Sequence, residues 1–497
     1  MQQQPIAPLF LFICAPSPLM KSRKSDFSEW YTEITKEAGL CDLRYNVKGF
    51  VVFMPWSVSS MKKMYAIYEK ELERTGHKPA WFPALIPESN FHKESKHVEG
   101  FTPQVFWVEK AGDTVLEERL AMRPTSETAM YQMYSLWIQG KKDLPIKIWH
   151  QSQVWRYETK ATRPFIRSRE FYWIEAHDAF ATRAEAEAQV KEDMEMSQNV
   201  IFEQFGVPFI FFERPQWDKF PGADFTYAAD TMMPDGRVLQ LPSTHLLGQN
   251  FAKPFDVKYL NEKGEHEYCH QTCYGPAISR IYAAIFSVHG DDTGIIMPFE
   301  LAPVQAMIVP IPKKGNEDAV IAKAKSIVAL LCASGIKAEG DFSDSTPGYK
   351  YNWWEMKGVP FRVEIGAREA ESGILTVARR DNKTKHQVKE SELASFILSE
   401  AKAMLIDMKK KAQAAFDGTL SHADTLAVLS TGLEKGKLVA VPFCSMEMEG
   451  KKCADAIKEK SGGDVRGTRF DKKEKPQGNC IVCGKTASAI VYIARQY

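Results

Sequence analysis

A strand–loop–strand pattern at residues 154–177, VWRYETKATRPFIRSREFYWIEAH, constrains the fold more than any other stretch. Side chains alternate between the two faces of a strand. In the second strand, four side chains share one face: Phe171, Trp173, Glu175 and His177. Their neighbours Tyr172, Ile174 and Ala176 form a mainly apolar opposite face. We therefore expect a hairpin that packs one face on a core and presents the other face to a site.

The hairpin is also rich in cations. Guanidinium groups are planar and permanently charged, so they suit phosphate oxygens. Aromatic walls suit a flat base or a small apolar ring. The cations are Arg156, Lys160, Arg163, Arg167 and Arg169. The combination predicts a pocket for a phosphorylated nucleotide beside a small, positively charged ligand. The alternative is a surface hairpin whose arginines are solvated.

The length of 497 residues allows about three domains, each with its own core. The formal net charge is +1, so no overall field attracts nucleic acid. Any RNA contact must come from local basic runs such as 409–411 and 472–475, which are otherwise solvated helix ends or loops. The apolar run 6–15 is too short to span a bilayer. We expect residues 1–24 to be a disordered extension, or else a targeting peptide, and we expect no membrane partner.

Residues 25–300 contain runs of strand patterns that mostly do not alternate with helices. This order predicts an α+β domain built on an antiparallel sheet, rather than a doubly wound nucleotide fold. The sequence has no glycine loop of the usual NTPase pattern. The expected helices cover 25–40, 58–75, 128–140 and 183–205, and several strands are expected between 207 and 270.

Several polar residues of this domain are candidate ligands. Thr125 and Glu127 precede a helical pattern, where they either cap the helix or face a cationic amine. Arg280 lies on an otherwise apolar helix, so it should face an anion or an acid. Three side chains lie near the end of one strand, where ligands or backbone bonds could satisfy them: Gln240, Ser243 and His245.

The pattern changes after Pro303, where strands and helices begin to alternate. Residues 301–405 therefore predict a compact α/β domain. Its segment 346–358, TPGYKYNWWEMKG, mixes aromatic side chains with three charged ones: Lys350, Glu355 and Lys357. Interleaved aromatics and cations can hold unstacked bases of single-stranded RNA. The alternative is a helix whose tryptophans close the core.

The tail, residues 406–497, is distinguished by its cysteines. The chain has nine, and an odd number without a secretory signal indicates a reducing compartment. Four lie in the tail: Cys444, Cys453, Cys480 and Cys483. Four thiolates can complete a closed tetrahedral zinc site. A metal would help this lysine-rich segment to fold. The alternative is four unrelated thiols.

Four blocks resemble, in order, those of the prolyl-tRNA synthetases, which are class II aminoacyl-tRNA synthetases. They are RPTSET at 123–128, RYE with IRSREFYWIEAH within 156–177, HLLGQNF at 245–251 and GYKYNWWEMKGVPFRVEIG at 348–366. The ordered set is more specific than any single block, and the resemblance covers residues 25–497. The cysteine-bearing tail and Tyr497 resemble the eukaryotic and archaeal type. The chain between Arg156 and Arg280 is too short for the editing domain inserted in many bacterial relatives.

The resemblance implies a fold and an activity. The fold would be a class II antiparallel-sheet catalytic domain at 25–300, an α/β anticodon-binding domain at 301–405 and a small zinc-binding-type α+β domain at 406–497. A motif near 76–83 would support a homodimer. The activity would join L-proline to the 3′ end of tRNA(Pro) through prolyl-adenylate, releasing AMP and pyrophosphate. It would use ATP and Mg²⁺, with structural Zn²⁺, in the cytoplasm.

The resemblance also implies residue roles. Arg156 would be catalytic, holding the α-phosphate and the amino acid carboxylate. The ATP site would comprise Arg156, Glu158, Arg167, Ser168, Phe171, Gln240, Ser243 and Arg280. The proline pocket would comprise Phe101, Thr125, Glu127, Arg156, Trp173, Glu175, His177 and His245. The anticodon contacts would include Lys350, Glu355 and Lys357. The zinc ligands would be Cys444, Cys453, Cys480 and Cys483.

The sequence departs from the family pattern at three places. LPSTHL at 241–246 replaces a GGTSHH-like run, Gln104 stands where Glu is common, and the tail has CxxC where some relatives are more tightly spaced. Two other functions are compatible with the scaffold: a non-catalytic tRNA-binding relative, and a synthetase for another amino acid. Retention of the phosphate-binding arginines Arg156, Arg167 and Arg280 favours a catalyst over the non-catalytic alternative.

Overall fold

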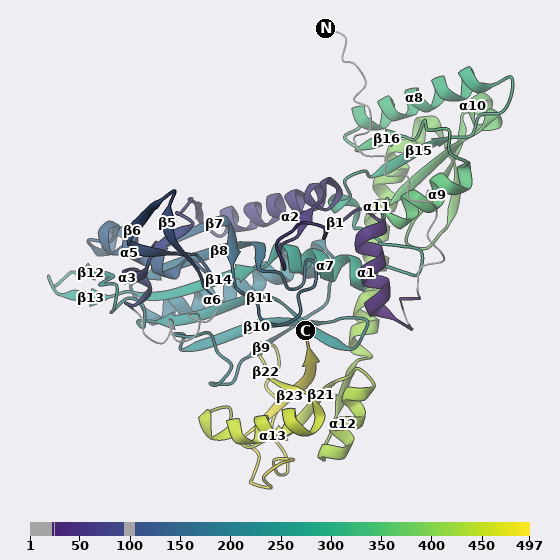
Figure 1. Ribbon diagram of the computed structural model, residues 1–497. Helices are drawn as coiled ribbons and strands as arrows, with labels where there is room; N and C mark the ends of the chain where they lie inside the picture. Colours follow the sequence, from purple (N-terminus) through teal and green to yellow (C-terminus); the bar gives the residue numbers. More distant parts are fainter. Residues whose placement is uncertain (1–21, 24, 94–104) are drawn as a thin grey trace.

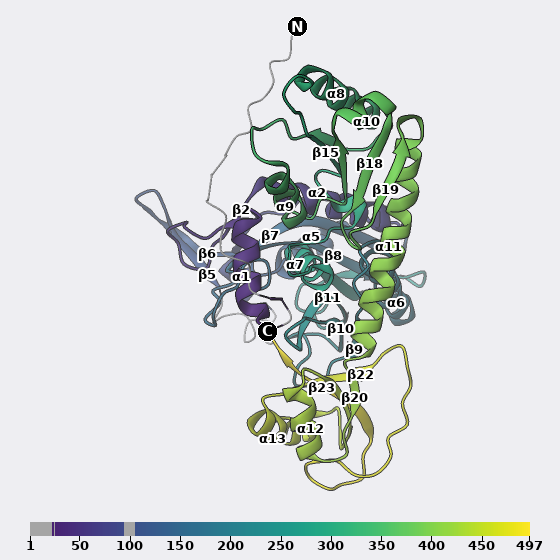
Figure 2. The ribbon, with the colours of Figure 1, turned by 90° about the vertical axis from the view of Figure 1, so that its right-hand side faces the viewer.

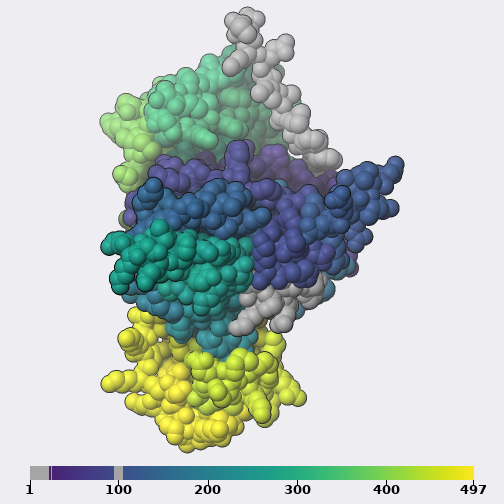
Figure 3. All heavy atoms as spheres, turned by 90° about the vertical axis from the view of Figure 1, so that its left-hand side faces the viewer, coloured from purple at the N-terminus to yellow at the C-terminus, as the bar shows by residue number. Residues whose placement is uncertain are grey.

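The computed structural model describes residues 22–23, 25–93 and 105–497. A large central body lies between an α/β domain at one end and a C-terminal domain at the other (Figure 1, Figure 3). Most of the predicted extension 1–24, and the candidates Phe101 and Gln104, fall outside the described residues. No helix in the described part of the chain combines the length and the apolar character that a membrane crossing requires.

The central body is built on an antiparallel sheet, as the sequence predicted. From β9 to β7 each strand pairs antiparallel with its neighbour, and β3 then joins β7 in parallel. In spatial order the strands are β9 (Ile210–Glu213), β10 (Phe225–Met232), β11 (Arg237–Gly248), β14 (His270–Pro276), β8 (Glu170–Phe180), β7 (Ile146–Trp155) and β3 (Lys78–Pro79).

The predicted hairpin is the pair β7 and β8, with Val154 opposite Phe171. Ile174 and Ala176 on its apolar face are fully buried. They join one core cluster with residues of the four main helices that accompany the sheet. These helices are α1 (Phe27–Glu37), α2 (Pro55–Arg74), α6 (Arg183–Ser197) and α7 (Ile278–His289). The opposite face of the hairpin is therefore left for a site. The helix expected at 183–205 is α6, followed by a π-helical segment, Gln198–Gln204.

Shorter elements complete the body. Helix α5 (Glu127–Trp137) corresponds to the helix expected at 128–140 and begins one residue earlier. A three-stranded antiparallel sheet lies beside it, and two hairpins lie at the periphery. These elements are β4 (Leu85–Pro87), β5 (Phe106–Ala111), β6 (Thr114–Met122), α3 (Glu88–Phe91), β1 (Cys41–Asp42), β2 (Val52–Phe53), β12 (Lys258–Leu260) and β13 (His266–Tyr268).

The α/β domain has a five-stranded sheet in the order β16-β15-β17-β18-β19. The first three strands are parallel, and the last two pairings are antiparallel. Its strands are β15 (Ala306–Pro310), β16 (Ala338–Gly340), β17 (Phe361–Ile365), β18 (Ile374–Arg379) and β19 (Lys385–Lys389). Its helices are α8 (Glu317–Ala333), α9 (Pro347–Met356), α10 (Ala367–Ser372) and α11 (Leu393–Asp417).

Helix α11 continues through the boundary that we predicted between residues 405 and 406. It runs along one side of the molecule from the α/β domain to the C-terminal domain (Figure 2). The C-terminal elements are β20 (Leu420–His422), α12 (Leu426–Glu434), β21 (Leu438–Phe443), α13 (Lys451–Ser461), β22 (Asp464–Arg469) and β23 (Ala489–Gln496).

The C-terminal strands extend the central sheet, which the sequence did not indicate. Strand β22 pairs antiparallel with β9, with Thr468 opposite Glu213. Strand β23 also pairs with β11 in parallel, with Arg237 opposite Arg495. One sheet of eleven strands therefore passes through both domains. The tail is thus fixed to the central sheet by backbone hydrogen bonds.

A contact between two glycine turns brings these domains close together. Gly236, in the turn between β10 and β11, has a φ of +74°. A Cβ atom there would lie 2.2 Å from the Cα of Gly436 in the C-terminal domain. Neither turn can move away without displacing the strand to which it leads. The position therefore requires glycine for both conformation and space.

We expect Gly236→Ala to lower the free energy of unfolding more than Gly264→Ala. Both residues have positive φ, but nothing lies within 4 Å of a Cβ at Gly264. The left-handed conformation alone disfavours alanine by about 1–2 kcal/mol, and overpacking adds about 1–3 kcal/mol at Gly236. Denaturant unfolding of the two variants measures the difference. Equal destabilisation would show that the turns separate easily.

Candidate active site

A cavity of about 300 Å³ opens on the polar face of the β7–β8 hairpin. It is lined by residues from the hairpin, from β11 and β14, from α7 and from the C-terminal domain. Most residues predicted for nucleotide and proline binding come together here. They are Thr125, Glu127, Arg156, Phe171, Trp173, Glu175, His177, Gln240, Ser243, His245 and Arg280.

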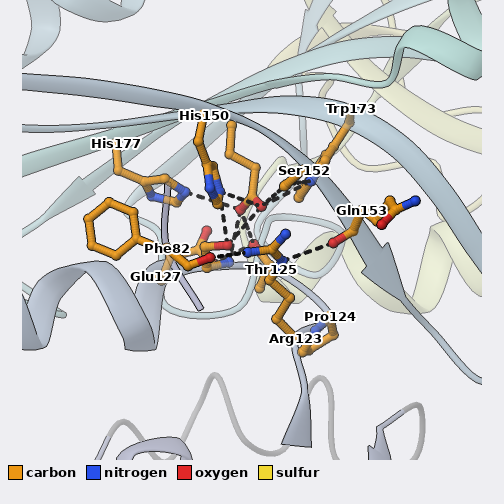
Figure 4. Close-up of polar contacts among 12 residues, drawn as sticks. Phe82, Arg123, Pro124, Thr125, Glu127, His150, Ser152, Gln153, Trp173 and His177 are labelled. Carbon is orange, nitrogen blue, oxygen red and sulfur yellow. Dashed lines mark hydrogen bonds and ion pairs between the residues drawn. The ribbon is translucent and has the colours of Figure 1, made fainter. Parts of the chain in front are cut away.

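A buried carboxylate, Glu175, organises one end of this cavity. Figure 4 shows several of the side chains that bond to it, among them His150, Ser152 and Trp173. Its oxygens accept hydrogen bonds from the Ser126 amide and hydroxyl, both at 2.8 Å, and from the Ser152 hydroxyl at 2.8 Å. Further polar neighbours are Trp173 Nε1 at 3.0 Å, His150 Nε2 at 3.2 Å, His177 Nε2 at 3.2 Å and Thr125 Oγ1 at 3.3 Å. Its acceptor positions are therefore occupied by the protein itself.

The pKa of Glu175 follows from this cage. Burial acts to raise the pKa, but hydrogen bonds from His150 and His177 and their charges outweigh burial and hold it well below its usual range. For His177, burial acts to lower the pKa, but the neighbouring carboxylates Glu127 and Glu175 raise it overall. Burial lowers the pKa of His245 to about 3, and the cations His177 and Arg156 add to the effect. His245 is therefore neutral at pH 7.

Glu127 is the carboxylate best placed to receive a cation. It is 1% exposed, lines the cavity, and accepts a hydrogen bond from the Thr125 hydroxyl. As the first residue of α5 it also lies at a positive helix end. Its oxygen, a His177 nitrogen and the Cys273 sulfur lie within 4.8 Å of one another, so these donor types could also hold a metal ion. Glu127 therefore faces the cavity and does more than cap a helix.

Two arginines dominate the other end of the cavity. Arg156 Nε donates to the Pro124 carbonyl at 3.0 Å, and its guanidinium lies 5.2 Å from the centroid of the Phe171 ring. Arg280 Nη1 donates to the Gln240 carbonyl at 3.1 Å. Burial, together with the charges of Arg167 and Arg156, lowers the pKa of Arg280 to about 10. Because these cations repel one another, this end of the cavity favours an anion such as a polyphosphate.

Three predicted ATP-site residues lie in the hairpin loop, outside the cavity lining. Arg167 pairs with Glu158 at 3.0 Å and also donates to the Tyr497 carbonyl at 2.6 Å. The Ser168 hydroxyl donates to the Glu170 carbonyl at 2.6 Å. These side chains are thus engaged with the protein, and their contacts with ATP remain predictions.

Sequence reasoning missed two kinds of site residue. His150 and Ser152 hold Glu175, and extending the period-two rule backwards from Arg156 would have found them. Others come from distant segments and carry no local signal: Arg214, Lys219, Phe220, Cys273, Arg466 and Gln496. Arg466 and Gln496 reach the cavity only because the C-terminal strands join the central sheet.

The three predicted anticodon residues make contacts within the protein. Lys350 is 4% exposed and donates to the Asp341 carbonyl at 2.9 Å. Glu355 pairs with Arg362 at 2.6 Å. The Lys357 ammonium lies 4.6 Å from the Trp56 ring centroid, and burial lowers its pKa to about 8. A contact of these side chains with RNA remains a prediction.

The four tail cysteines converge. Their sulfur atoms lie within 4.8 Å of one another, and those of Cys444 and Cys453 are 3.7 Å apart. Cys453 lies on α13, whereas Cys480 and Cys483 lie in the turn before β23. Four converging sulfur donors match the ligand set of a closed zinc site. Cys444 and Cys453 are nine positions apart in the sequence, and the fold still brings their sulfur atoms together.

Comparison with known proteins identifies three family models along the chain. Residues 106–289 match a tRNA synthetase class II core domain (G, H, P, S and T). Residues 305–400 match an anticodon binding domain. Residues 428–497 match a prolyl-tRNA synthetase C-terminal domain. The three matches follow the order of the central body, the α/β domain and the C-terminal domain along the chain.

Similar proteins cover nearly the whole chain. A proline–tRNA ligase of Thermofilum pendens is 52% identical, covering 96% of this chain and 98% of its own length. One from Methanopyrus kandleri is 41% identical, covering 95% and 96%. The structure of Giardia lamblia prolyl-tRNA synthetase with prolyl-adenylate has a TM-score of 0.92 at 35% identity, covering 96% and 99%. The Cryptosporidium parvum enzyme with halofuginone and AMPPNP has a TM-score of 0.91 at 31% identity, with the same coverage.

We expect about one zinc ion per chain, held by the four tail cysteines. Cys480→Ser should lose this zinc and make the segment after residue 417 more sensitive to protease, because metal and folding are coupled. The exposed Cys332 on α8 provides the control, and Cys332→Ser should keep both the zinc and the resistance. Metal analysis and limited proteolysis measure these outcomes. Zinc retained by Cys480→Ser would contradict the assignment.

Proposed function

The chain belongs to the prolyl-tRNA synthetase family, and we propose that it is a proline–tRNA ligase acting through prolyl-adenylate. The proline carboxylate attacks the α-phosphorus of ATP, and pyrophosphate leaves. The prolyl group then passes to a ribose hydroxyl at the 3′ end of tRNA(Pro), and AMP is released. No covalent enzyme intermediate is needed. The observation that carries this proposal is one cavity with arginines at one end and a buried carboxylate at the other.

The arginine end would bind ATP. Arg156 holds the α-phosphate and the substrate carboxylate, and it stabilises the charge that develops during attack. Phe171 and Arg280 enclose the adenine, and Gln240 and Ser243 lie beside the nucleotide. Glu158, Arg167 and Ser168 would meet the adenine edge and the outer phosphates when the loop closes on them. Mg²⁺ bound to the phosphates would neutralise their charge, and the Ser243 hydroxyl offers an oxygen donor nearby.

The carboxylate end would bind proline. Glu127 pairs with the secondary ammonium of the ring, because the oxygens of Glu175 already accept hydrogen bonds from the protein. Trp173 packs against the methylenes, while Thr125, His177 and His245 complete the wall, with Phe101 as a further predicted member. Apolar selection is worth only about 1–3 kcal/mol per methylene. Cysteine and alanine are therefore the expected misactivated amino acids.

The remaining assignments extend the same proposal. The domain at 305–400 would bind the tRNA anticodon, with Lys350, Glu355 and Lys357 near the contact. Two chains would form a homodimer through the region of residues 76–83. The tail cysteines would hold a structural zinc ion. The enzyme would act in the cytoplasm, where tRNA is charged.

Pyrophosphate exchange tests the proposed reaction directly. We expect exchange that depends on proline and ATP and that is much weaker with other amino acids in a panel, because Glu127 and Trp173 select a cyclic secondary ammonium. Exchange with a different amino acid in place of proline would assign a different synthetase. Absence of exchange with every amino acid would favour a non-catalytic tRNA-binding relative.

Arg156→Ala should lose about 2.7–4 kcal/mol of transition-state stabilisation, the scale for one key electrostatic donor. This corresponds to a loss of about 100- to 1000-fold in exchange rate. Arg183→Ala serves as the control, since Arg183 is a solvated residue paired with Glu187 on α6. A loss below tenfold in Arg156→Ala would remove its catalytic role.

Glu127→Gln should raise the KM for proline at least tenfold, because losing one partner of a buried charge pair is worth about 2–5 kcal/mol. Glu175→Gln should lower both activity and thermal stability, because it breaks the cage around that carboxylate. The exposed Glu262 supplies a neutral control as Glu262→Gln. If the proline KM were unchanged in Glu127→Gln, another group would bind the ammonium.

A further inference from the structure

A buried ion cluster connects the C-terminal domain to the cavity. We define the Asp230 cluster as Asp230 on β10, Arg214 just after β9, and Arg466 on β22. Asp230 pairs with Arg214 at 2.8 Å and with Arg466 at 2.7 Å. Both guanidiniums contact both carboxylate oxygens. All three side chains are at most 3% exposed.

The cluster is charged and held in place by several contacts. Burial acts to raise the pKa of Asp230, but the charges of Arg214 and Arg466 and their hydrogen bonds lower it overall. Arg214 Nη1 also donates to the Arg466 carbonyl at 2.7 Å, so backbone and side chain of Arg466 both engage the cluster. Breaking one buried ionic contact leaves the other charges uncompensated, which strongly disfavours rearrangement.

Arg214 connects the Asp230 cluster to Gln240, a predicted ATP-binding residue. Arg214 Nη2 donates to the Gln240 side-chain oxygen at 3.3 Å. A guanidinium has only donors, so it fixes which end of the carboxamide faces it. The Gln240 amide nitrogen must then point away from Arg214. Arg280 holds the backbone carbonyl of Gln240 at 3.1 Å, and Gln240, Arg214 and Arg466 all line the cavity.

We propose that Arg466 is a positioning residue for adenylate formation: acting through Asp230 and Arg214, it orients Gln240 so that its amide hydrogens donate to an oxygen of the bound ATP. This inference rests on the proposed function, since it concerns the same ATP site. It makes the C-terminal domain part of the catalytic apparatus. A residue of the tail, 226 positions after Gln240 in the sequence, decides which atoms Gln240 offers to the nucleotide.

Arg466→Met tests the proposal in pyrophosphate exchange with the full chain. We expect the KM for ATP to rise about three- to tenfold, the scale of one misplaced hydrogen bond, while the KM for proline stays within twofold. Arg469→Met is the matched control, because Arg469 lies on the same strand but pairs with Asp471 and does not line the cavity. Its kinetic constants should stay within twofold of those of the unaltered protein.

A double-mutant cycle separates positioning from a general structural role. In a Gln240→Met background, Arg466→Met should leave the KM for ATP within twofold, because its target is already gone. Additive effects would overturn the proposal. So would equal rises in the KM for ATP and for proline, or an ATP KM that changes less than twofold in Arg466→Met.

Two further measurements keep the test decisive. Zinc content and thermal midpoint show whether Arg466→Met folds. If it does not, Arg466→Lys keeps the charge but lacks the fork that contacts both oxygens, and it should still raise the ATP KM selectively. An unchanged ATP KM in Arg466→Lys overturns the proposal.

Proline-dependent exchange in the unaltered protein is measured first. Its absence would refute the proposed function, whereas its presence with an unchanged ATP KM in the variant would refute this inference alone.

Discussion

The carboxylate of Glu175 ties together the elements that make the cavity. Its partners come from β7, from β8 itself and from the residues that start α5. A buried charge is tolerated only when hydrogen bonds replace the water it has lost. The cage therefore fixes the distance between the hairpin and α5. Glu127, the first residue of that helix, is positioned as a consequence.

The opposite end of the cavity is lined by two arginines, Arg156 and Arg280. Backbone carbonyls accept hydrogen bonds from Arg156 and Arg280, and the charges of Glu127 and Glu175 also act on Arg156. Burial, followed by the charges of Arg167 and Arg156, lowers the pKa of Arg280, so an anion would stabilise this end of the cavity. In the proposed reaction, a nucleotide polyphosphate would supply that charge. One end of the site would thus be completed by the protein and the other by its substrate, which suits a reaction whose catalysis is positioning and charge stabilisation.

The continuity of the central sheet gives the tail a role in the site. Strand β22 adds to β9 and carries Arg466 into the Asp230 cluster. The two glycine turns at 236 and 436 allow the same approach from the other end of β10. The central body and the C-terminal domain, which the sequence patterns separate, therefore share one sheet beside the cavity. Cys453 and Cys480 lie in the same core cluster as Val465, the neighbour of Arg466 on β22.

The sequence by itself determined the local features. The alternation of side chains with period two predicted the hairpin and placed Phe171, Trp173, Glu175 and His177 on one face. The ordered blocks indicated the family and its antiparallel fold. Only the tertiary structure decided which of the cavity carboxylates is caged by hydrogen bonds, because partners of Glu175 such as Ser126 and His150 come from other elements. It also decided that α11 crosses the expected boundary and that Arg466 reaches the site. Strand pairing between distant segments depends on the packing of whole faces, which no local pattern records.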